Sequence, residues 1–359
     1  MMTKSTEAKS PKSVDISDAS SVDTKIEESF DASNERFERV RSLWFEDGNV
    51  VIVAQESGFR VHKSVLSRHS SVFVKILNDS NDSDALLDQL GIVIDADNKI
   101  EGSVVIHVSD STHDFGHLLR IFYDGFDYLK HTRSDDFADL AAATRLAHKY
   151  TVSVVLSEAT LRLQQLFPPT FDIWEATEDV RVAAERVRPQ DAVEAVNLFR
   201  TLGSAGKADD MLPIALYLCC QLAPGELLRG HHRADGTLER LSIDDVELCW
   251  KLRETLSEKA AEMTEQLYRR VAGSADAEKK KCKCFNAFEK SVPWKSLKEA
   301  RGGDPLGRML RDGIEAEKEK GFKLCDKCLS TLRELEKTVR GEFWEELHRD
   351  YGRAQDEQQ

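Results

Sequence analysis

A run of branched apolar residues from Val50 to Val53 most constrains how this chain can fold. Side chains alternate between the two faces of a strand, so consecutive apolar residues predict a strand that is buried on both faces. Asp47-Gly48 precedes the run as a turn, and Glu56-Ser57-Gly58 separates it from a second short strand at 59–61. We therefore expect a hairpin whose first strand is covered from both sides.

Helical spacing dominates the sequence around this hairpin. Phe37, Val40 and Leu43 recur every three residues, which predicts a short helix leading into Trp44. The Asp- and Asn-rich residues 78–103 are interpreted as an insertion that holds at most a short apolar element. A further strand is expected at 104–108, and the apolar spacing predicts helices over 65–77, 115–122, 137–147 and 152–167.

The pair Pro168-Pro169 marks the clearest boundary in the chain, because proline ends helices and restricts the residue before it. Residues 1–35 contain almost no large apolar side chain, so they cannot offset their chain entropy and are expected to be disordered. The remaining segments are predicted to be an α+β domain at 36–167, an all-helical module at 168–275, a cysteine-pair segment with a long C-terminal helix at 276–352, and a disordered tail at 353–359.

The charge balance disfavours polyanionic partners. Lys and Arg number 50 and Asp and Glu number 64, so the formal net charge is −14. Nucleic acid and anionic membrane surfaces are therefore not expected as partners. No window approaches the roughly 20 apolar residues that cross a bilayer, and no signal-peptide pattern is present. An odd total of 7 cysteines argues against a disulfide scaffold. We expect an intracellular protein, cytoplasmic, nuclear or both.

Two cysteine pairs carry the strongest chemical signal. Cys282-Lys283-Cys284 and Cys325-Asp326-Lys327-Cys328 supply four thiolates, the number that a tetrahedral structural zinc site takes. A Cys-x-x-Cys pair at a helix start places both sulfurs on one face, where the helix N-terminus favours the thiolate. The first pair is spaced more closely than usual, so two interpretations stay open. Either Cys282, Cys284, Cys325 and Cys328 bind one structural zinc, or they pack as small apolar side chains.

Residues 59–73, FRVHKSVLSRHSSVF, resemble the signature stretch of BTB/POZ domains. The succession continues through Val104–Asp110 and Phe115 to Tyr123-Asp124-Gly125, which is similar to the strand, helix and Y-x-G turn of that family. Residues 44–51, WFEDGNVV, are similar to the opening of its fungal subgroup, whose members continue into a helical tail. The positions that carry the resemblance are Asn49, Phe59, His62, Lys63, Leu66, Ser70, Phe73, Tyr123 and Gly125.

The resemblance implies an α+β N-terminal BTB/POZ-like domain followed by a mostly α-helical C-terminal region. It also implies a module that binds other proteins, often a second copy of itself, and that performs no chemistry. In this family an acidic and a basic residue of the dimer groove face partner peptides; the resemblance places Asn49 at the acidic position and Lys63 at the basic one. Because Asn49 is uncharged, that ion pair is not expected here. His62 is expected to be a hydrogen-bonded structural histidine.

We therefore expect a non-enzymatic protein-interaction protein. Self-association would use edge strands and the segment at 37–43, with a homodimer and a monomer both left open. One alternative is a substrate adaptor of a cullin-type ubiquitin ligase, although Ile100-Glu101 lacks the spacer of the family's apolar-x-Glu cullin motif. A further alternative is a transcriptional regulator that acts through partners. No catalytic motif or cofactor fingerprint is recognisable, so apart from the zinc no cofactor is expected.

Overall fold

The apolar run forms β2 (Val50–Ala54), the central strand of a five-stranded sheet with the order β1-β3-β2-β5-β4. All of its residues are buried, and it pairs antiparallel with β3 (Ser57–Val61) and parallel with β5 (Ser103–Val108). The predicted hairpin and its two-sided burial are confirmed. This computed structural model describes residues 37–78, 84–125, 137–183, 187–272, 304–308, 310 and 324–356.

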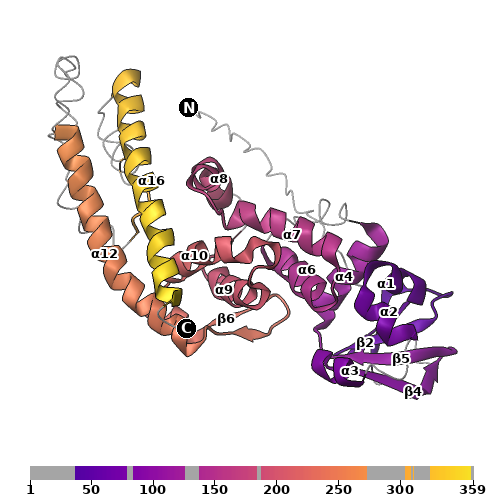
Figure 1. Cartoon of the computed structure of the whole chain (residues 1–359). Helices are drawn as coiled ribbons and strands as arrows, with labels where there is room; N and C mark the ends of the chain where they lie inside the picture. The colour runs from indigo at the N-terminus through magenta and orange to yellow at the C-terminus, as the bar shows by residue number, and fades with distance from the viewer. Residues whose placement is uncertain are drawn as a thin grey trace, which may run out of the picture. The chain divides into compact units, whose positions relative to one another are not determined.

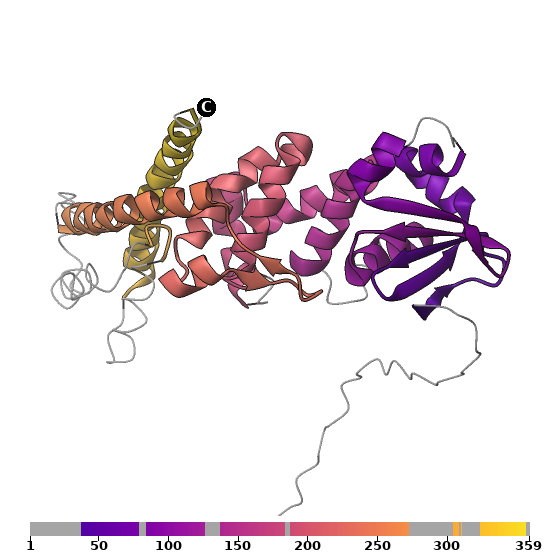
Figure 2. The same cartoon turned by 90° about the horizontal axis from the view of Figure 1, so that it is seen from below.

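The two faces of the sheet are covered differently. Ile52 lies in the same buried cluster as Phe115 of α4 (Thr112–Asp124), so this face packs against helices. Figure 1 shows α1 and α2 beside the strands, and Figure 2 shows the strands from below. Phe37 and Trp44 pack against the opposite face, whose smaller cluster consists of Val51, Val53, Ile100 and Val105.

The predicted helix at 37–43 is wrong, because this segment forms β1 (Glu38–Trp44). It pairs in parallel with β3, with Glu38 opposite Ser57 and an irregularity between Arg39 and Trp44. The spacing of Phe37, Val40 and Leu43 is compatible with one helix face, but pairing with β3 satisfies the backbone and lets Leu43 join the main core. A tertiary contact therefore overrides a weak local pattern.

The described part of 78–103, interpreted from the sequence as an insertion with at most a short apolar element, holds more regular structure than expected. This segment supplies α3 (Asp84–Leu90) and β4 (Ile92–Ile100), and β4 pairs antiparallel with β5 at the edge of the sheet. The Asp- and Asn-rich composition reflects an edge strand with a register shift between Asp95 and Lys99. Charge and bulges are common protections of sheet edges, and they hide the strand signal in the sequence.

The described helices of this part of the chain largely agree with the prediction. The expected helix over 65–77 is interrupted at Ser70, which separates two short helices. The helices of this part of the chain are α1 (Lys63–His69), α2 (Ser71–Asn78), α4 (Thr112–Asp124), α6 (Phe137–Lys149) and α7 (Ser153–Leu166).

The core continues beyond Pro168-Pro169. The rings of Phe167 and Phe199 lie 5.2 Å apart edge to face, and the described residues from Phe37 onward belong to one compact unit. The predicted boundary therefore separates helices within that unit. The elements that follow are α8 (Phe171–Ala183), α9 (Asp191–Leu202), η1 (Ala205–Lys207), α10 (Ala208–Cys219), α11 (Pro224–Arg229), β6 (His231–His232), β7 (Leu238–Glu239), α12 (Ile243–Ala272) and α16 (Asp326–Asp356).

Two expectations for the C-terminal region need correction. The module at 168–275 is not entirely helical, since β6 and β7 pair as a small antiparallel hairpin. Helix α16 continues to Asp356, so the predicted disordered tail at 353–359 is wrong for 353–356. Helix propagation adds one hydrogen bond per residue, and Arg, Ala and Gln at these positions are good helix formers. The predicted tail at 1–35 lies outside the described residues.

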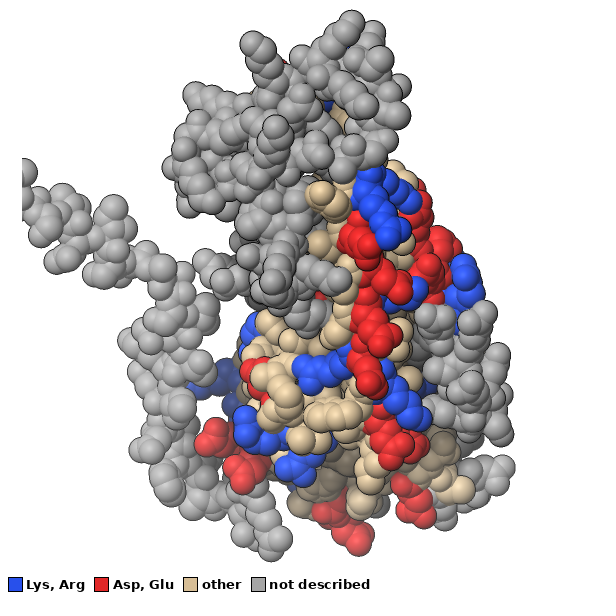
Figure 3. Space-filling view, turned by 90° about the vertical axis from the view of Figure 1, so that its left-hand side faces the viewer, with Lys and Arg blue, Asp and Glu red and all other residues tan. Residues whose placement is uncertain are grey.

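Helices α12 and α16 contact each other through apolar and charged side chains. Lys259 of α12 lies 3.2 Å from Glu346 of α16, and Arg270 lies 2.9 Å from Glu342. On the face viewed in Figure 3, acidic and basic side chains are interspersed. Such a surface offers no continuous basic patch among the described residues drawn there, in line with the negative net charge. Among the described helices, none is both long and apolar enough to cross a membrane.

Candidate functional site

Asn49 and Lys63 meet at the start of α1. The Asn49 side-chain oxygen accepts a hydrogen bond of 2.8 Å from the backbone N–H of Lys63. The first N–H groups of a helix have no partner within the helix. The Asn49 side chain, which lies before β2, caps α1 by accepting a hydrogen bond from one of them. The two residues that the resemblance places at the groove positions are therefore in contact, through a hydrogen bond from the Lys63 backbone.

His62 is held in a cluster of aromatic and polar groups. Its Nδ1 lies 2.9 Å from the Tyr123 hydroxyl, which also accepts a hydrogen bond of 3.0 Å from the His62 backbone N–H. Its Nε2 lies 3.1 Å from a carboxylate oxygen of Asp47, and Phe45 stacks on Tyr123 with ring centroids 4.6 Å apart. Both ring nitrogens have partners, as expected of a hydrogen-bonded histidine.

Ser70 links the break between α1 and α2 to the end of α6. Its buried hydroxyl donates a hydrogen bond of 2.6 Å to the carbonyl of Tyr150 and accepts one of 3.1 Å from the N–H of Phe73. The rings of Phe73 and Tyr150 stack with centroids 4.7 Å apart. A single hydroxyl thus satisfies two buried backbone groups and positions a core aromatic pair.

The other positions of the predicted signature also have structural roles. Phe59 and Leu66 are fully buried in the core. Gly125 follows α4 with φ of +71°, a conformation that glycine adopts without the steric cost of a side chain. The signature residues therefore explain how this part of the chain folds, and their contacts hold helices and strands together.

Only one of the two predicted cysteine pairs can be placed. Cys325 lies immediately before α16 and is exposed, and Cys328 lies in the first turn and is buried. The Cys-x-x-Cys pair thus lies at a helix start. Cys282 and Cys284 lie outside the described residues, so the convergence of four sulfurs stays a prediction. The donor chemistry of Cys325 and Cys328, two thiols at a helix N-terminus, fits zinc.

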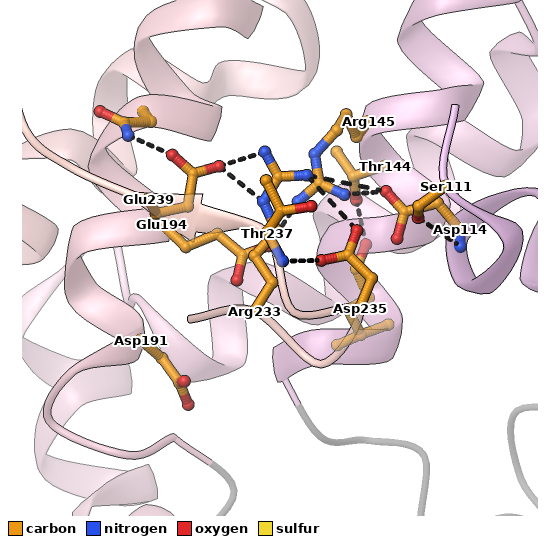
Figure 4. Close-up of polar contacts among 12 residues, drawn as sticks. Ser111, Asp114, Thr144, Arg145, Asp191, Glu194, Arg233, Asp235, Thr237 and Glu239 are labelled. Atoms are coloured by element: carbon orange, nitrogen blue, oxygen red, sulfur yellow. Dashed lines mark hydrogen bonds and ion pairs between the residues drawn. The ribbon is translucent and has the colours of Figure 1, made fainter. Parts of the chain in front are cut away.

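A buried network of charges joins α4 and α6 to α9 and the β6–β7 hairpin (Figure 4). Arg145 of α6 forms ion pairs with Asp114 of α4 and Glu194 of α9, whose side chains are 6% and 4% exposed. Arg233 in the hairpin pairs with Glu239 and lies 4.0 Å from Asp114. The network thus connects elements on both sides of Pro168-Pro169.

The ionisation of these groups follows from their burial and their neighbours. Burial raises the pKa of Glu194 to about 7, against the attraction of Arg145 and Arg233. Burial also acts to raise the pKa of Asp114, but the hydrogen bond with His113 and the charge of Arg145 outweigh it and hold that pKa below its usual value. Asp114 therefore carries the negative charge, while Glu194 titrates near neutral pH.

The network was not predicted from the sequence. Asp114, Arg145, Glu194 and Arg233 are spread over some 120 positions and lie on separate elements. The available signal was that Asp114 and Arg145 each lie within an apolar helical pattern, where charged residues are buried only when they are paired.

The two edges of the sheet are the candidate interaction surfaces. The outer strand β1 carries Glu38, Arg39 and Arg41 at exposed positions. Glu101, in the turn between β4 and β5, forms ion pairs with Arg39 and Arg60. At the other edge, β4 begins with an apolar stretch, Ile92–Ile94.

Comparison with known proteins agrees with this architecture. The model of the family described as BTB/POZ domain matches residues 41–165. Searches of curated proteins and of solved structures found no match for the chain. The family model spans all five strands except the first residues of β1, and it ends within α7. Residues 41–165 of this chain are therefore a BTB/POZ domain, which is a protein-interaction module.

Proposed function

We propose that the protein is a non-enzymatic assembly protein that forms a homodimer through the β4 edge of its BTB/POZ sheet. The helical region would then recruit further protein partners. The observation that carries this proposal is an apolar edge segment, Ile92–Ile94, on a sheet of an interaction-module family. A second copy of the chain is the partner that it fits, because strand edges pair with one another through complementary backbone groups.

The features of β4 favour it over β1 as the pairing edge. Residues 92–95 keep a regular antiparallel register against β5, so their outer backbone groups form an even row. Val93 is 63% exposed, which is unusual for a branched apolar residue in a strand. The charged residues and the register shift of β4 begin at Asp95, beyond its apolar stretch. In β1, three exposed charged residues and an irregular register occupy most of the strand, and both disfavour edge pairing.

The substitution Val93→Lys tests the proposal. Light scattering coupled to size-exclusion chromatography at tens of micromolar should report a dimer for the unaltered chain and a monomer for V93K. A lysine beside the edge opposes pairing because two copies would bring like charges together. Val154→Lys is the matched control, since Val154 on α7 is also exposed (76%) and lies outside the sheet. A monomeric unaltered chain, or a V93K protein as dimeric as V154K, would contradict the proposal.

The adaptor alternative gains no support from the residues that carry it. Glu101 is the nearest match to the acidic position of the cullin motif, and both of its carboxylate oxygens pair with arginines of this chain. A pull-down with the cullin scaffold tests the adaptor role, and imaging of the tagged protein tests nuclear entry for the transcriptional role.

We also propose that the cysteine pairs hold one structural zinc. The support is the placement of Cys325 and Cys328 at the start of α16, where the helix dipole stabilises thiolates. In this role the metal would stabilise the C-terminal region and take no part in chemistry.

A further inference from the structure

Helix α4 presents two histidines on one face toward α6. His113 and His117 are four positions apart, the spacing at which two imidazoles on one helix reach a common metal ion. Asp139, in the first turn of α6, faces them, and its Oδ1 lies 3.5 Å from Nε2 of His117. One ligand atom of each of these three residues lies within 4.8 Å of the other two.

These separations are close to those of a metal site. Zinc bonds to imidazole nitrogen and carboxylate oxygen are about 2.0–2.2 Å long, which places tetrahedral ligand atoms roughly 3.4 Å apart. The distance between His117 and Asp139 already matches this value. The widest separation is at most 4.8 Å, so it must shorten by no more than about 1.4 Å, a change within reach of small side-chain rotations. The rings of His113 and His117 lie with centroids 4.4 Å apart, so both already lie side by side.

A second layer of contacts supports the first. Nδ1 of His113 lies 3.2 Å from Oδ1 of Asp114, which leaves Nε2 of that ring for another partner. A histidine that donates one ring N–H to a carboxylate and offers the other nitrogen is the usual arrangement of metal-ligating histidines. Asp114 is itself fixed by its ion pair with Arg145 and by the hydrogen bond from its backbone N–H to Ser111. The orientation of the His113 ring is thus supported by Asp114, which belongs to the buried network of Figure 4.

We propose that His113, His117 and Asp139 form a binding site for a divalent transition metal of the zinc class. The donor set of two imidazoles and one carboxylate suits zinc and leaves a fourth position for water or for a ligand from a partner protein. The site is distinct from the predicted four-cysteine zinc site, since it lies within the BTB/POZ domain.

Carboxylates and basic side chains both surround the three residues. Asp114 and Asp139 contribute two carboxylates at or next to the site. The carboxylate of Asp235 also favours positive charge at His113. The positive charge of Arg120, one turn further along α4, disfavours positive charge at His117. Arg145 pairs with Asp114 and Arg233 lies 4.0 Å from Asp235, so a bound divalent ion would mainly offset the carboxylate of Asp139.

Cobalt(II) titration of the full chain tests this site separately from the cysteines. The titration uses metal-depleted protein in which Cys282, Cys284, Cys325 and Cys328 are all replaced by serine. We expect one equivalent of cobalt, with the weak visible bands of nitrogen and oxygen ligation and without the intense near-ultraviolet band of thiolate ligation. His117→Ala and Asp139→Asn should each weaken binding at least about tenfold. His232→Ala is the matched control, since His232 is exposed and lies in β6.

The outcomes separate cleanly. Circular dichroism checks that each variant is folded, and D139N, which keeps the size and shape of the side chain, serves if H117A does not fold. If the four-serine chain does not fold, H117A, D139N and H232A are made in the chain that keeps its cysteines. Mass spectrometry then measures the zinc content of each variant. There H117A and D139N should lose one equivalent and H232A none. Absence of cobalt binding in a folded four-serine chain, or an equal effect of H232A and D139N, overturns the proposal.

Discussion

Replacing Arg145 with methionine should destabilise the protein more than the removal of any single charged side chain on the surface. Arg145 is the common partner of Asp114 and Glu194, whose side chains are 6% and 4% exposed. Removing one partner of a buried ion pair typically costs about 3–5 kcal/mol, because a charge is left buried without compensation. Arg233 remains 4.0 Å from Asp114, and Glu194 can take up a proton, so the lower end applies. We expect a loss of about 3 kcal/mol in the free energy of unfolding.

Urea unfolding followed by tryptophan fluorescence measures this loss. With a slope of about 3 kcal/mol per M, the midpoint should fall by about 1 M in R145M. Arg269→Met is the control, since Arg269 pairs with Glu265 on the exposed surface of α12 and its loss should cost under about 0.5 kcal/mol. The double variant R145M/E194Q should recover part of the loss, because it removes one of the orphaned charges. An R145M midpoint equal to that of R269M would refute the reasoning.

Three further predictions concern other groups. Ser70→Ala should lower the free energy of unfolding by about 1–3 kcal/mol, since the Tyr150 carbonyl loses a buried donor; an unchanged midpoint in urea would contradict this. Because burial raises the pKa of Glu194 to about 7, the folded protein holds a proton there that the unfolded chain releases, so this carboxyl's contribution to stability should decline between about pH 4.5 and pH 7. Comparing unfolding midpoints of the unaltered chain and E194Q at pH 5 and pH 7.5 measures it; identical pH dependence argues against the assignment. Cys325→Ser together with Cys328→Ser should remove one equivalent of zinc from protein purified without added metal; an unchanged zinc content rules out ligation by this pair.

The sequence by itself was sufficient for the parts of the fold that rest on local patterns. The run at 50–53 predicted a strand buried on both faces, because consecutive apolar side chains need cover on both sides of a strand. The helices α4, α6 and α7 followed from apolar spacing. The order of signature residues from Phe59 to Gly125 indicated the BTB/POZ domain that the family model matches.

Tertiary structure decided the elements whose local signal is weak. Three apolar residues at spacing three in β1 suit one face of a helix and therefore predict one. The backbone of β3, with which β1 pairs, is available to it only in the folded chain. Strand β4 was hidden by the polar residues that protect a sheet edge. The partners of Arg145 and the approach of Asp139 to two histidines are likewise set by how α4, α6 and α9 pack. Charged side chains show in the sequence, but their partners lie on distant elements, and which charges meet depends on packing that no local spacing encodes.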